Sequence, residues 1–270
     1  MFALEAYFKR IGFAGSRKPT VDTLKTLHLL HPFTIPFENL NPFSRTQVKL
    51  DMESLQNKLV LNNRGGYCFE QNLLFSEALT TLGFKVRKLA ARVRWNVADE
   101  VITPRGHMLL LVNVGDEAFI ADTGFGNLTL TAPLKFELNT EQQTPHEVFR
   151  IIQAGDEFLL QAKIGANWKS IYQFSLQEQF LPDYEVTNWY LSNFPASHFL
   201  NGIIIAKPFN EGRYILHNNQ FSIYHLDGTT ERTLIQNPDE LQQIIKKVFL
   251  IDFQWDEQSK QRLYNLIRPA

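Results

Sequence analysis

Cysteine and an excess of charge of either sign are nearly absent from the sequence. A single cysteine, Cys68, stands among 270 residues, which excludes an internal disulfide framework and is typical of a reducing compartment. The 27 Lys and Arg residues are balanced by 28 Asp and Glu residues, a formal net charge of −1. Nucleic-acid phosphates are bound by clustered basic residues, so we expect no nucleic-acid partner.

Long hydrophobic runs are also missing. A membrane-spanning helix needs roughly 20 apolar residues in succession, and no stretch of this chain approaches that length. The N-terminal segment MFALEAYFKRIGFAG lacks the basic start, apolar centre and cleavage site of a signal peptide. We therefore expect a cytoplasmic protein with no membrane partner. Without further ligand-spaced Cys and His pairs, we also expect no metal.

The hydrophobic content of 44 % is enough for two or three modest cores. Periodicity in the first third predicts a short amphipathic helix near the N-terminus, with Phe2, Leu4, Phe8 and Ile11 on one face, and three further helices. The first of these three begins after Thr20 and stops at Pro32, the second covers DMESLQNKLVL, and the third runs from about Tyr67 to Leu82 with Gly83 as its cap.

Residues 86–175 change to the period of two that is typical of strands. The segment HMLLLVNV is apolar on both faces and predicts a central strand, and Ala154–Glu157 predicts a hairpin turn. A connector, a second hairpin and a helix that begins at Asn237 and Pro238 follow. We predict an α+β fold with a helical bundle (1–85), an antiparallel β-barrel or sheet (86–185), a connector (186–210) and a C-terminal α/β lid (211–270).

Cys68 lies in the stretch RGGYCFEQN. Two glycines allow a tight turn before it, and the free N–H groups at a helix start stabilise a thiolate. Arg64 either adds positive charge or ties the loop down, whereas Glu70 opposes a thiolate. A lone cysteine is also commonly a small buried hydrophobe. Local context leaves both readings of Cys68 open.

A nucleophile needs a base and a group that orients the base. His107 opens the predicted central strand, and Asp122 ends the strand that follows in IADTGFG. If these strands pair, Asp122 can accept the imidazole N–H and fix its tautomer. Alone, His107 fits a satisfied rim histidine and Asp122 fits a turn residue. Together with Cys68 they predict a Cys-His-Asp triad.

The segments RGGYCFEQN, HMLLLV and ADTGFG, with HPFTIPFENL and NWYLSNFPASHF, resemble the arylamine N-acetyltransferase family over nearly the whole chain. The resemblance implies the same three-part plan, with a core similar to those of cysteine proteases and transglutaminases. It implies Cys68 as acetyl-accepting nucleophile, His107 as base and Asp122 as orienting group. It also implies acetyl-coenzyme A (acetyl-CoA) as donor, arylamines, arylhydrazines or N-hydroxyarylamines as acceptors, and a ping-pong reaction through an acetyl-cysteine.

An aromatic acceptor needs apolar walls, for which Phe37 and Phe125 are our candidates. The candidates for coenzyme A contacts are Trp95, Thr103, Gly124, Gly126 and Phe194. No P-loop or comparable phosphate motif is present, and a homo-oligomer is compatible with the sequence.

Two rival functions remain at this stage. A hydrolase of the papain or transglutaminase type uses the same triad, although papain-like enzymes place the histidine further downstream. A binding module with a structural Cys68 is the non-enzymatic rival. The residue just before His107 is Gly106, whereas the family pattern commonly has a larger polar residue at this position. We therefore expect an altered approach to the site.

Overall fold

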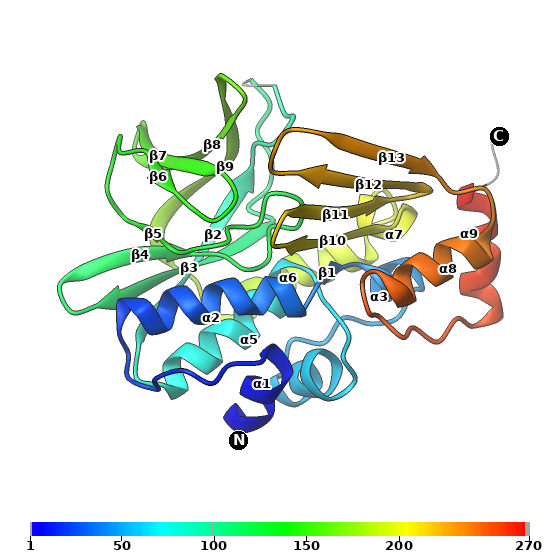
Figure 1. The fold of residues 1–270 in the computed structure, drawn as a ribbon, viewed down its shortest axis with the longest axis horizontal. Coiled ribbons are helices and arrows are strands. Elements are labelled where there is room, and N and C mark those ends of the chain that lie inside the picture. Colours follow the sequence, from blue (N-terminus) through cyan, green and yellow to red (C-terminus); the bar gives the residue numbers. More distant parts are fainter. Residues whose placement is uncertain (1, 99, 268–270) are drawn as a thin grey trace.

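The computed structural model describes residues 2–98 and 100–267 and combines two antiparallel sheets with helices below and beside them (Figure 1). The helices are α1 (Leu4–Ile11), α2 (Val21–Thr34), α3 (Leu40–Phe43), α4 (Met52–Leu55), α5 (Cys68–Thr81), α6 (Leu181–Asn193), α7 (His198–Asn201), α8 (Pro238–Lys247) and α9 (Glu257–Ile267), with a π-helix, η1 (Gln56–Leu61). The strands are β1 (Phe37–Glu38), β2 (Lys85–Val93), β3 (His107–Val114), β4 (Glu117–Ala121), β5 (Leu134–Lys135), β6 (Gln142–Gln143), β7 (Val148–Ala154), β8 (Glu157–Ile164), β9 (Asn167–Glu178), β10 (Ile204–Phe209), β11 (Gly212–His217), β12 (Gln220–His225) and β13 (Thr230–Leu234).

Helix α2 begins where the sequence predicts but ends later. Thr20 caps it by accepting the Thr23 N–H at 3.3 Å. The prediction that Pro32 stops the helix is wrong, because α2 continues through Pro32 to Thr34. Proline removes one intrahelical hydrogen bond, and α2 extends only two residues beyond it. The other predicted N-terminal helices are confirmed as α1, as α4 with η1 and as α5.

The larger sheet confirms the predicted antiparallel sheet or barrel. Its eight strands run in the order β5-β4-β3-β2-β9-β8-β7-β6. The sheet is nearly closed, because the side chain of Gln142 in β6 exchanges two 2.8 Å hydrogen bonds with the backbone of Lys135 in β5. The predicted central strand is β3, between β2 and β4, and residues 154 to 157 form the turn between β7 and β8.

The smaller sheet joins distant parts of the chain. Its order is β1-β10-β11-β12-β13, with Phe37 of β1 opposite Ala206 of β10. The second hairpin and α8 are confirmed, whereas α9 and the contribution of β1 were not predicted. Leu40 and Phe43 of α3 also lie in the C-terminal core. Residues 37–43, which the prediction assigns to the helical bundle (1–85), therefore pack with the C-terminal sheet and its core. The division into three units stays a prediction.

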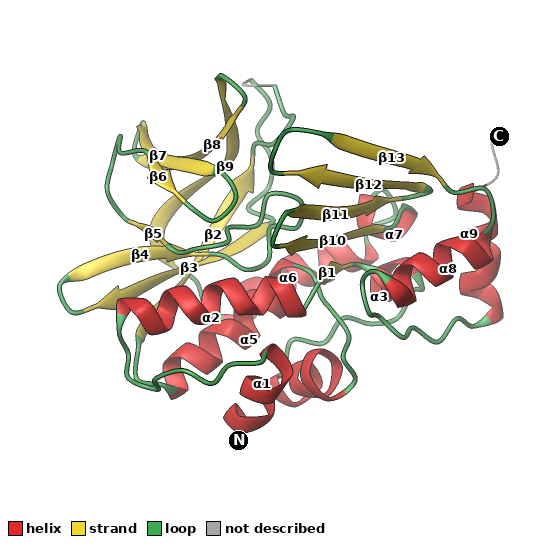
Figure 2. Cartoon of the chain, viewed as in Figure 1, coloured by secondary structure: helices red, strands yellow, loops and turns green. Residues whose placement is uncertain are grey.

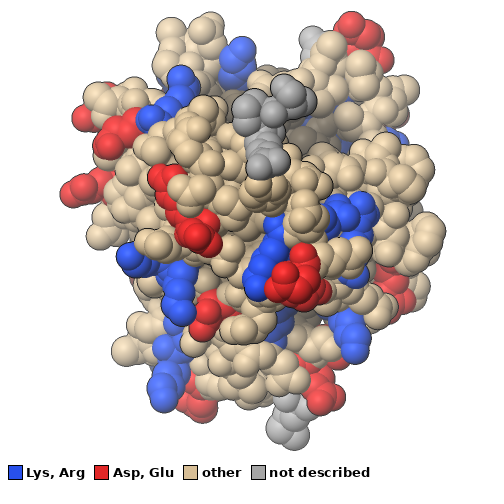
Figure 3. All heavy atoms as spheres, turned by 90° about the vertical axis from the view of Figure 1, so that its right-hand side faces the viewer, with Lys and Arg blue, Asp and Glu red and all other residues tan. Residues whose placement is uncertain are grey.

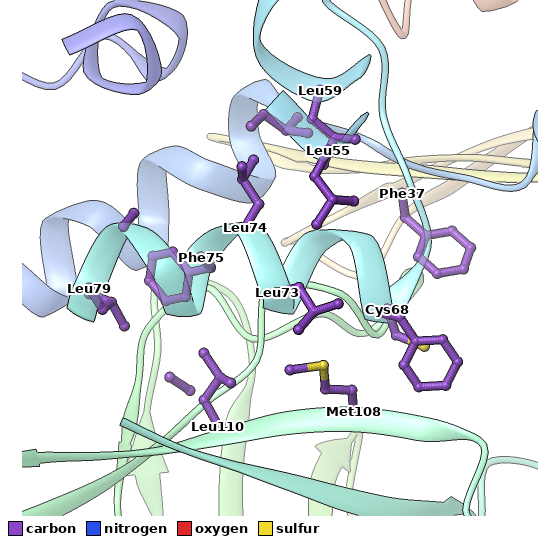
Figure 4. Packing of buried hydrophobic residues seen from close by; sticks show 14 of the residues in the cluster. Phe37, Leu55, Leu59, Cys68, Leu73, Leu74, Phe75, Leu79, Met108 and Leu110 are labelled. Carbon is purple, nitrogen blue, oxygen red and sulfur yellow. The ribbon is translucent and has the colours of Figure 1, made fainter. Parts of the chain in front are cut away.

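Three hydrophobic clusters stabilise this arrangement, and Figure 2 shows the mixture of helices and strands that they join. One lies between the N-terminal helices and one face of the barrel sheet, where Leu73 and Phe75 of α5 approach Met108 and Leu110 of β3 (Figure 4). The second fills the barrel and the third lies under the smaller sheet. Cys68 is part of the first cluster, at the start of α5 (Figure 4).

Charges of both signs share one face of the molecule. On the face drawn in Figure 3, basic and acidic side chains are interspersed among other residues. Within residues 2–98 and 100–267, no helix has the length and apolar character needed to cross a bilayer.

Candidate active site

The turn before Cys68 is held against the segment that enters the smaller sheet. Gly66 donates its N–H to the Pro36 carbonyl at 3.2 Å and accepts the Glu38 N–H at 3.1 Å. A Cβ on Gly65 would lie 2.0 Å from the Pro36 carbonyl oxygen, which is far inside van der Waals contact. Only glycine allows this close approach, and the approach places Cys68 as the first residue of α5.

The charged neighbours of Cys68 are paired with one another. The Arg64 guanidinium donates to Glu38 Oε1 at 2.6 and 2.9 Å, so Arg64 ties the loop down, the second of the two roles considered above. The Glu70 carboxylate accepts from Lys58 at 2.7 Å and from the Tyr67 N–H at 3.1 Å. The negative charge of Glu70 is therefore balanced by Lys58.

His107 and Asp122 form a buried hydrogen bond, as the pairing of β3 and β4 predicts. His107 Nε2 lies 2.7 Å from Asp122 Oδ2, with both side chains at most 4 % exposed. This bond leaves Nδ1 as the ring nitrogen available to Cys68, whose thiol also lies 3.8 Å from the Gly106 carbonyl oxygen. Burial opposes a charge on the ring, but the Asp122 carboxylate and a hydrogen bond with Cys68 raise the pKa of His107 to about 10.

Hydrogen bonds fix both the carboxylate and the backbone N–H of Asp122. Its Oδ1 accepts from Asn72 Nδ2 and from the Gly124 N–H, both at 2.9 Å. Its own N–H donates to His28 Nε2 at 3.0 Å. Burial opposes ionisation of the carboxyl, but the charge of His107 and these hydrogen bonds lower the pKa of Asp122.

A cavity of about 510 Å³ opens next to Cys68 and His107. Its size is typical of a small-molecule site. It is lined by nine of the ten predicted site residues, the exception being Asp122, which lies behind His107: Phe37, Cys68, Trp95, Thr103, His107, Gly124, Phe125, Gly126 and Phe194. Most of the other walls are apolar, including Leu191, Phe199 and Ile204.

Two aromatic rings pack against His107, Phe125 from the cavity wall and the buried Tyr172 from outside the cavity. The Phe125 ring meets the His107 ring edge-on, at a centroid distance of 5.2 Å, and the Tyr172 ring lies 5.0 Å away. Two larger hollows, of about 780 and 660 Å³, lie along residues 45–51 and are lined mainly by polar and charged side chains. Neither contains Cys68 or His107.

Three contributors to the site were missed from the sequence. Asn72 lies four residues after Cys68 and so on the same face of α5, a spacing that offered a signal. His28 follows the buried Leu27 on α2, but no local pattern links it to Asp122. Tyr172 comes from β9, which becomes a neighbour of β2 only in the folded sheet.

Two glycines predicted to contact coenzyme A also have a structural role. A Cβ on Gly124 would lie 2.8 Å from the Cα of Cys68, and one on Gly126 would lie 3.3 Å from the Phe37 ring. The loop after Asp122 thus packs directly on the start of α5.

In the described part of the chain, no group of three or more His, Cys, Asp or Glu side chains is arranged to hold a metal ion.

Known proteins resemble this chain over most of its length. A family model described as N-acetyltransferase matches residues 20–258. The arylamine N-acetyltransferase of Escherichia coli K12 is 39 % identical over 91 % of this chain and 88 % of its own length. The arylamine N-acetyltransferase / N-hydroxyarylamine O-acetyltransferase of Salmonella typhimurium is 40 % identical over the same shares of both chains.

Solved structures are similar over nearly the whole chain. The arylamine N-acetyltransferase of Mycobacterium tuberculosis superposes with a TM-score of 0.93 at 36 % identity, covering 97 % of this chain and 99 % of its own. That of Mycobacterium marinum in complex with CoA gives a TM-score of 0.93 at 34 % identity and the same coverage. Matches of this extent in sequence and in fold establish that this chain belongs to the arylamine N-acetyltransferase family.

Proposed function

We propose that this protein transfers an acetyl group from acetyl-CoA to an arylamine, arylhydrazine or N-hydroxyarylamine through an acetyl-cysteine at Cys68. The observation that carries the proposal is the arrangement of Cys68, His107 and Asp122 beside an apolar cavity. Family membership and the CoA complex of the Mycobacterium marinum relative support the choice of donor.

In the first half-reaction, Cys68 becomes acetylated. The Cys68 thiolate attacks the thioester carbonyl, forming a new C–S bond while the bond to coenzyme A breaks. The His107 imidazolium gives its proton to the departing coenzyme A thiolate. One thioester replaces another, so the step needs little net free energy. The Cys68 N–H, in the first turn of α5, is the proposed donor to the oxyanion.

In the second half-reaction, the acceptor nitrogen attacks the carbonyl of acetyl-Cys68. A C–N bond forms, the C–S bond breaks, and the nitrogen loses a proton to His107. The thiolate and the imidazolium are thereby restored together. Asp122 accepts the His107 Nε2–H throughout and stabilises the charged ring, so that the other ring nitrogen can exchange protons with the reactants.

The cavity walls divide between the two substrates in this proposal. Phe37 and Phe125 contact the aromatic acceptor close to Cys68. Contacts with coenzyme A fall to a second set of lining residues: Trp95, Thr103, Gly124, Gly126 and Phe194. The N–H groups of both glycines in that set are engaged, with Asp122 Oδ1 and Thr129 Oγ1, so their contribution is close backbone contact instead of hydrogen bonding.

Mass spectrometry of the intact protein with acetyl-CoA alone tests the proposal. We expect one acetyl group, mapped to Cys68, that is absent in Cys68→Ala and is discharged by an added arylamine. The chain has no other cysteine, so adducts elsewhere are readily separated from the expected one. Absence of any adduct between about pH 6 and 9, the range between free His and Cys pKa values, rejects the proposal.

A further inference from the structure

Asn72 makes contacts that the proposed reaction does not account for. Its side chain is fully buried one turn after Cys68 on α5. Nδ2 donates to the Met108 carbonyl at 2.8 Å and to Asp122 Oδ1 at 2.9 Å. Oδ1 accepts from the Thr123 N–H at 3.1 Å. Both amide hydrogens and the amide oxygen are therefore used.

The partners of Asn72 are a triad residue, Asp122, and two residues that follow triad residues in the sequence. Met108 follows His107 on β3, and Thr123 follows Asp122 at the end of β4, while Asn72 itself shares the helix that begins with Cys68. One side chain thus links the three segments that carry Cys68, His107 and Asp122. Gly124 supplies the other hydrogen bond to Asp122 Oδ1, but it comes from the same loop as Asp122 and cannot fix that loop relative to α5.

We propose that Asn72 is a positioning residue, which fixes the Asp122 carboxylate relative to His107 and α5 by its bridge between Asp122 Oδ1, the Met108 carbonyl and the Thr123 N–H. The inference rests on the proposed function of Cys68. Loss of the bridge frees the carboxylate to rotate away from His107 Nε2, and supporting residues of this kind typically contribute about 10- to 100-fold to activity.

Replacing Asn72 by aspartate gives a specific signature. Two carboxyl groups would then lie within hydrogen-bonding distance, and such a pair holds a shared proton because both cannot ionise easily. The titratable groups that face Asp122 are His107 on β3, His28 on α2 and Tyr172 on β9. These groups include no second carboxylate. The wild-type protein therefore lacks the ionisation of a shared carboxyl proton that Asn72→Asp introduces.

The test compares kcat/KM for acetyl transfer in wild type, Asn72→Ala and Asn72→Asp between pH 6 and 9. We expect Asn72→Ala to lose about 10- to 100-fold at every pH. Asn72→Asp is expected to be most active at pH 6, where the shared proton replaces the amide donor to Asp122 although the hydrogen bond to the Met108 carbonyl is lost, and to lose activity as the pH rises. Asn39→Asp is the matched control, a fully buried amide whose partners are backbone groups of residues 199, 202 and 204. It should destabilise the fold without adding this ionisation.

Wild-type values of kcat/KM and a wild-type pH profile in both Asn72 variants overturn the inference. If Asn72→Ala does not fold, the pH profile of the isosteric Asn72→Asp decides alone. Failure of the proposed function is distinguishable, because wild type itself would then form no acetyl adduct on Cys68.

Discussion

At the scale of single residues, the hydrogen bond between His107 and Asp122 decides which ring nitrogen faces Cys68. Asp122 Oδ2 accepts from Nε2 at 2.7 Å, so Nδ1 is left to exchange a proton with the thiol. In Asp122→Asn an amide group can donate to Nε2 and favour the opposite tautomer. We expect kcat/KM to fall about 10³- to 10⁴-fold, measured by acetyl transfer to an arylamine.

The exposed Asp116, in the turn between β3 and β4, provides the control for this prediction. Asp116→Asn loses the same charge from the same hairpin without contacting His107, and its kcat/KM should match that of wild type. Equal activities of the two variants would contradict the role given to Asp122.

The pH dependence of Cys68 alkylation is a second prediction at this scale. The carboxylate of Asp122 helps to raise the pKa of His107 to about 10, and a raised pKa means that the ring loses its proton only as the pH rises through that value. A neighbouring imidazolium favours a thiolate. Between pH 6 and 9 we therefore expect iodoacetamide to modify Cys68 faster than free cysteine and at a nearly constant rate.

His107→Gln is the control for alkylation, since it removes the positive charge beside the thiol. Its alkylation rate should increase with pH in the manner of an ordinary thiol. A wild-type rate that increases about tenfold per pH unit through pH 8, as for free cysteine, would exclude a charged His107 beside a thiolate.

At the scale of secondary-structure elements, α2 carries two buried neutral histidines. Burial lowers the pKa of His28 to about 4 and that of His31 to about 3. Both rings meet Phe75 of α5 edge-on, and His31 is hydrogen-bonded to Tyr7 and Gln71. Below about pH 6.5, these two rings therefore stay neutral in the folded protein, whereas in the unfolded chain they bind protons.

Stability should consequently fall as the pH falls from about 6.5 toward 4. In that window, each neutral ring lowers the free energy of unfolding by about 1.4 kcal/mol for every unit by which the pH falls. Above pH 6.5 this loss is absent, because the ring is neutral in the folded and the unfolded chain alike. Urea unfolding at several pH values measures the slope. His28→Gln, which keeps an acceptor for the Asp122 N–H but does not titrate, should reduce the slope by the share of one ring, about 1.4 kcal/mol per pH unit. An undiminished slope in His28→Gln would contradict the prediction.

The loop before α5 permits a further prediction about an element. Gly65→Ala would place a methyl group 2.0 Å from the Pro36 carbonyl oxygen, so the loop must move and take the start of α5 with it. We expect a loss of about 1–3 kcal/mol in the free energy of unfolding and slower acetylation of Cys68. In Gly106→Ala the new methyl meets nothing nearer than 3.8 Å. This control should unfold as wild type does, and a similar loss of stability in both variants would show that steric overlap at Gly65 is not the cause.

At the scale of the whole molecule, the segment that contains β1 and α3 connects two of the three hydrophobic clusters, the one around α5 and the one under the smaller sheet. Phe37 pairs with β10 and Phe43 packs under the smaller sheet, although both precede the barrel in sequence. We therefore expect a single cooperative transition, with coincident midpoints by far-UV circular dichroism and tryptophan fluorescence.

Asn39→Ala tests this connection. The variant removes hydrogen bonds to the carbonyls of residues 199 and 202 and from the N–H of residue 204. It should lower the free energy of unfolding by about 1–3 kcal/mol and move both midpoints together. Separate transitions for the two probes would instead favour independently folding units.

Much of the site was predictable because the relevant signals are local. The period of two in β2, the continuous apolar run of β3, the turn before Glu117 and the glycines before Cys68 are readable from neighbouring residues. Pairing β3 with β4 across a short turn is enough to bring His107 toward Asp122. The end of α2 was mispredicted because proline's effect depends on its place in the helix, and α9 has a weak apolar stripe, with only Leu263 and Ile267 of its hydrophobic side chains buried.

The sequence by itself therefore determined most of the elements, the hairpin that joins His107 to Asp122, and the family to which the chain belongs. Only the tertiary structure decided how α5 lies on β3, which residues hold Asp122, and how Phe37, Phe194 and Phe199 close one cavity around Cys68. The physical reason is that hydrophobic periodicity and turn chemistry act between near neighbours along the chain. Contacts such as Asn72 with Asp122 and His28 with the Asp122 N–H join residues 50 and 94 positions apart, and only the packing of the complete core brings them together.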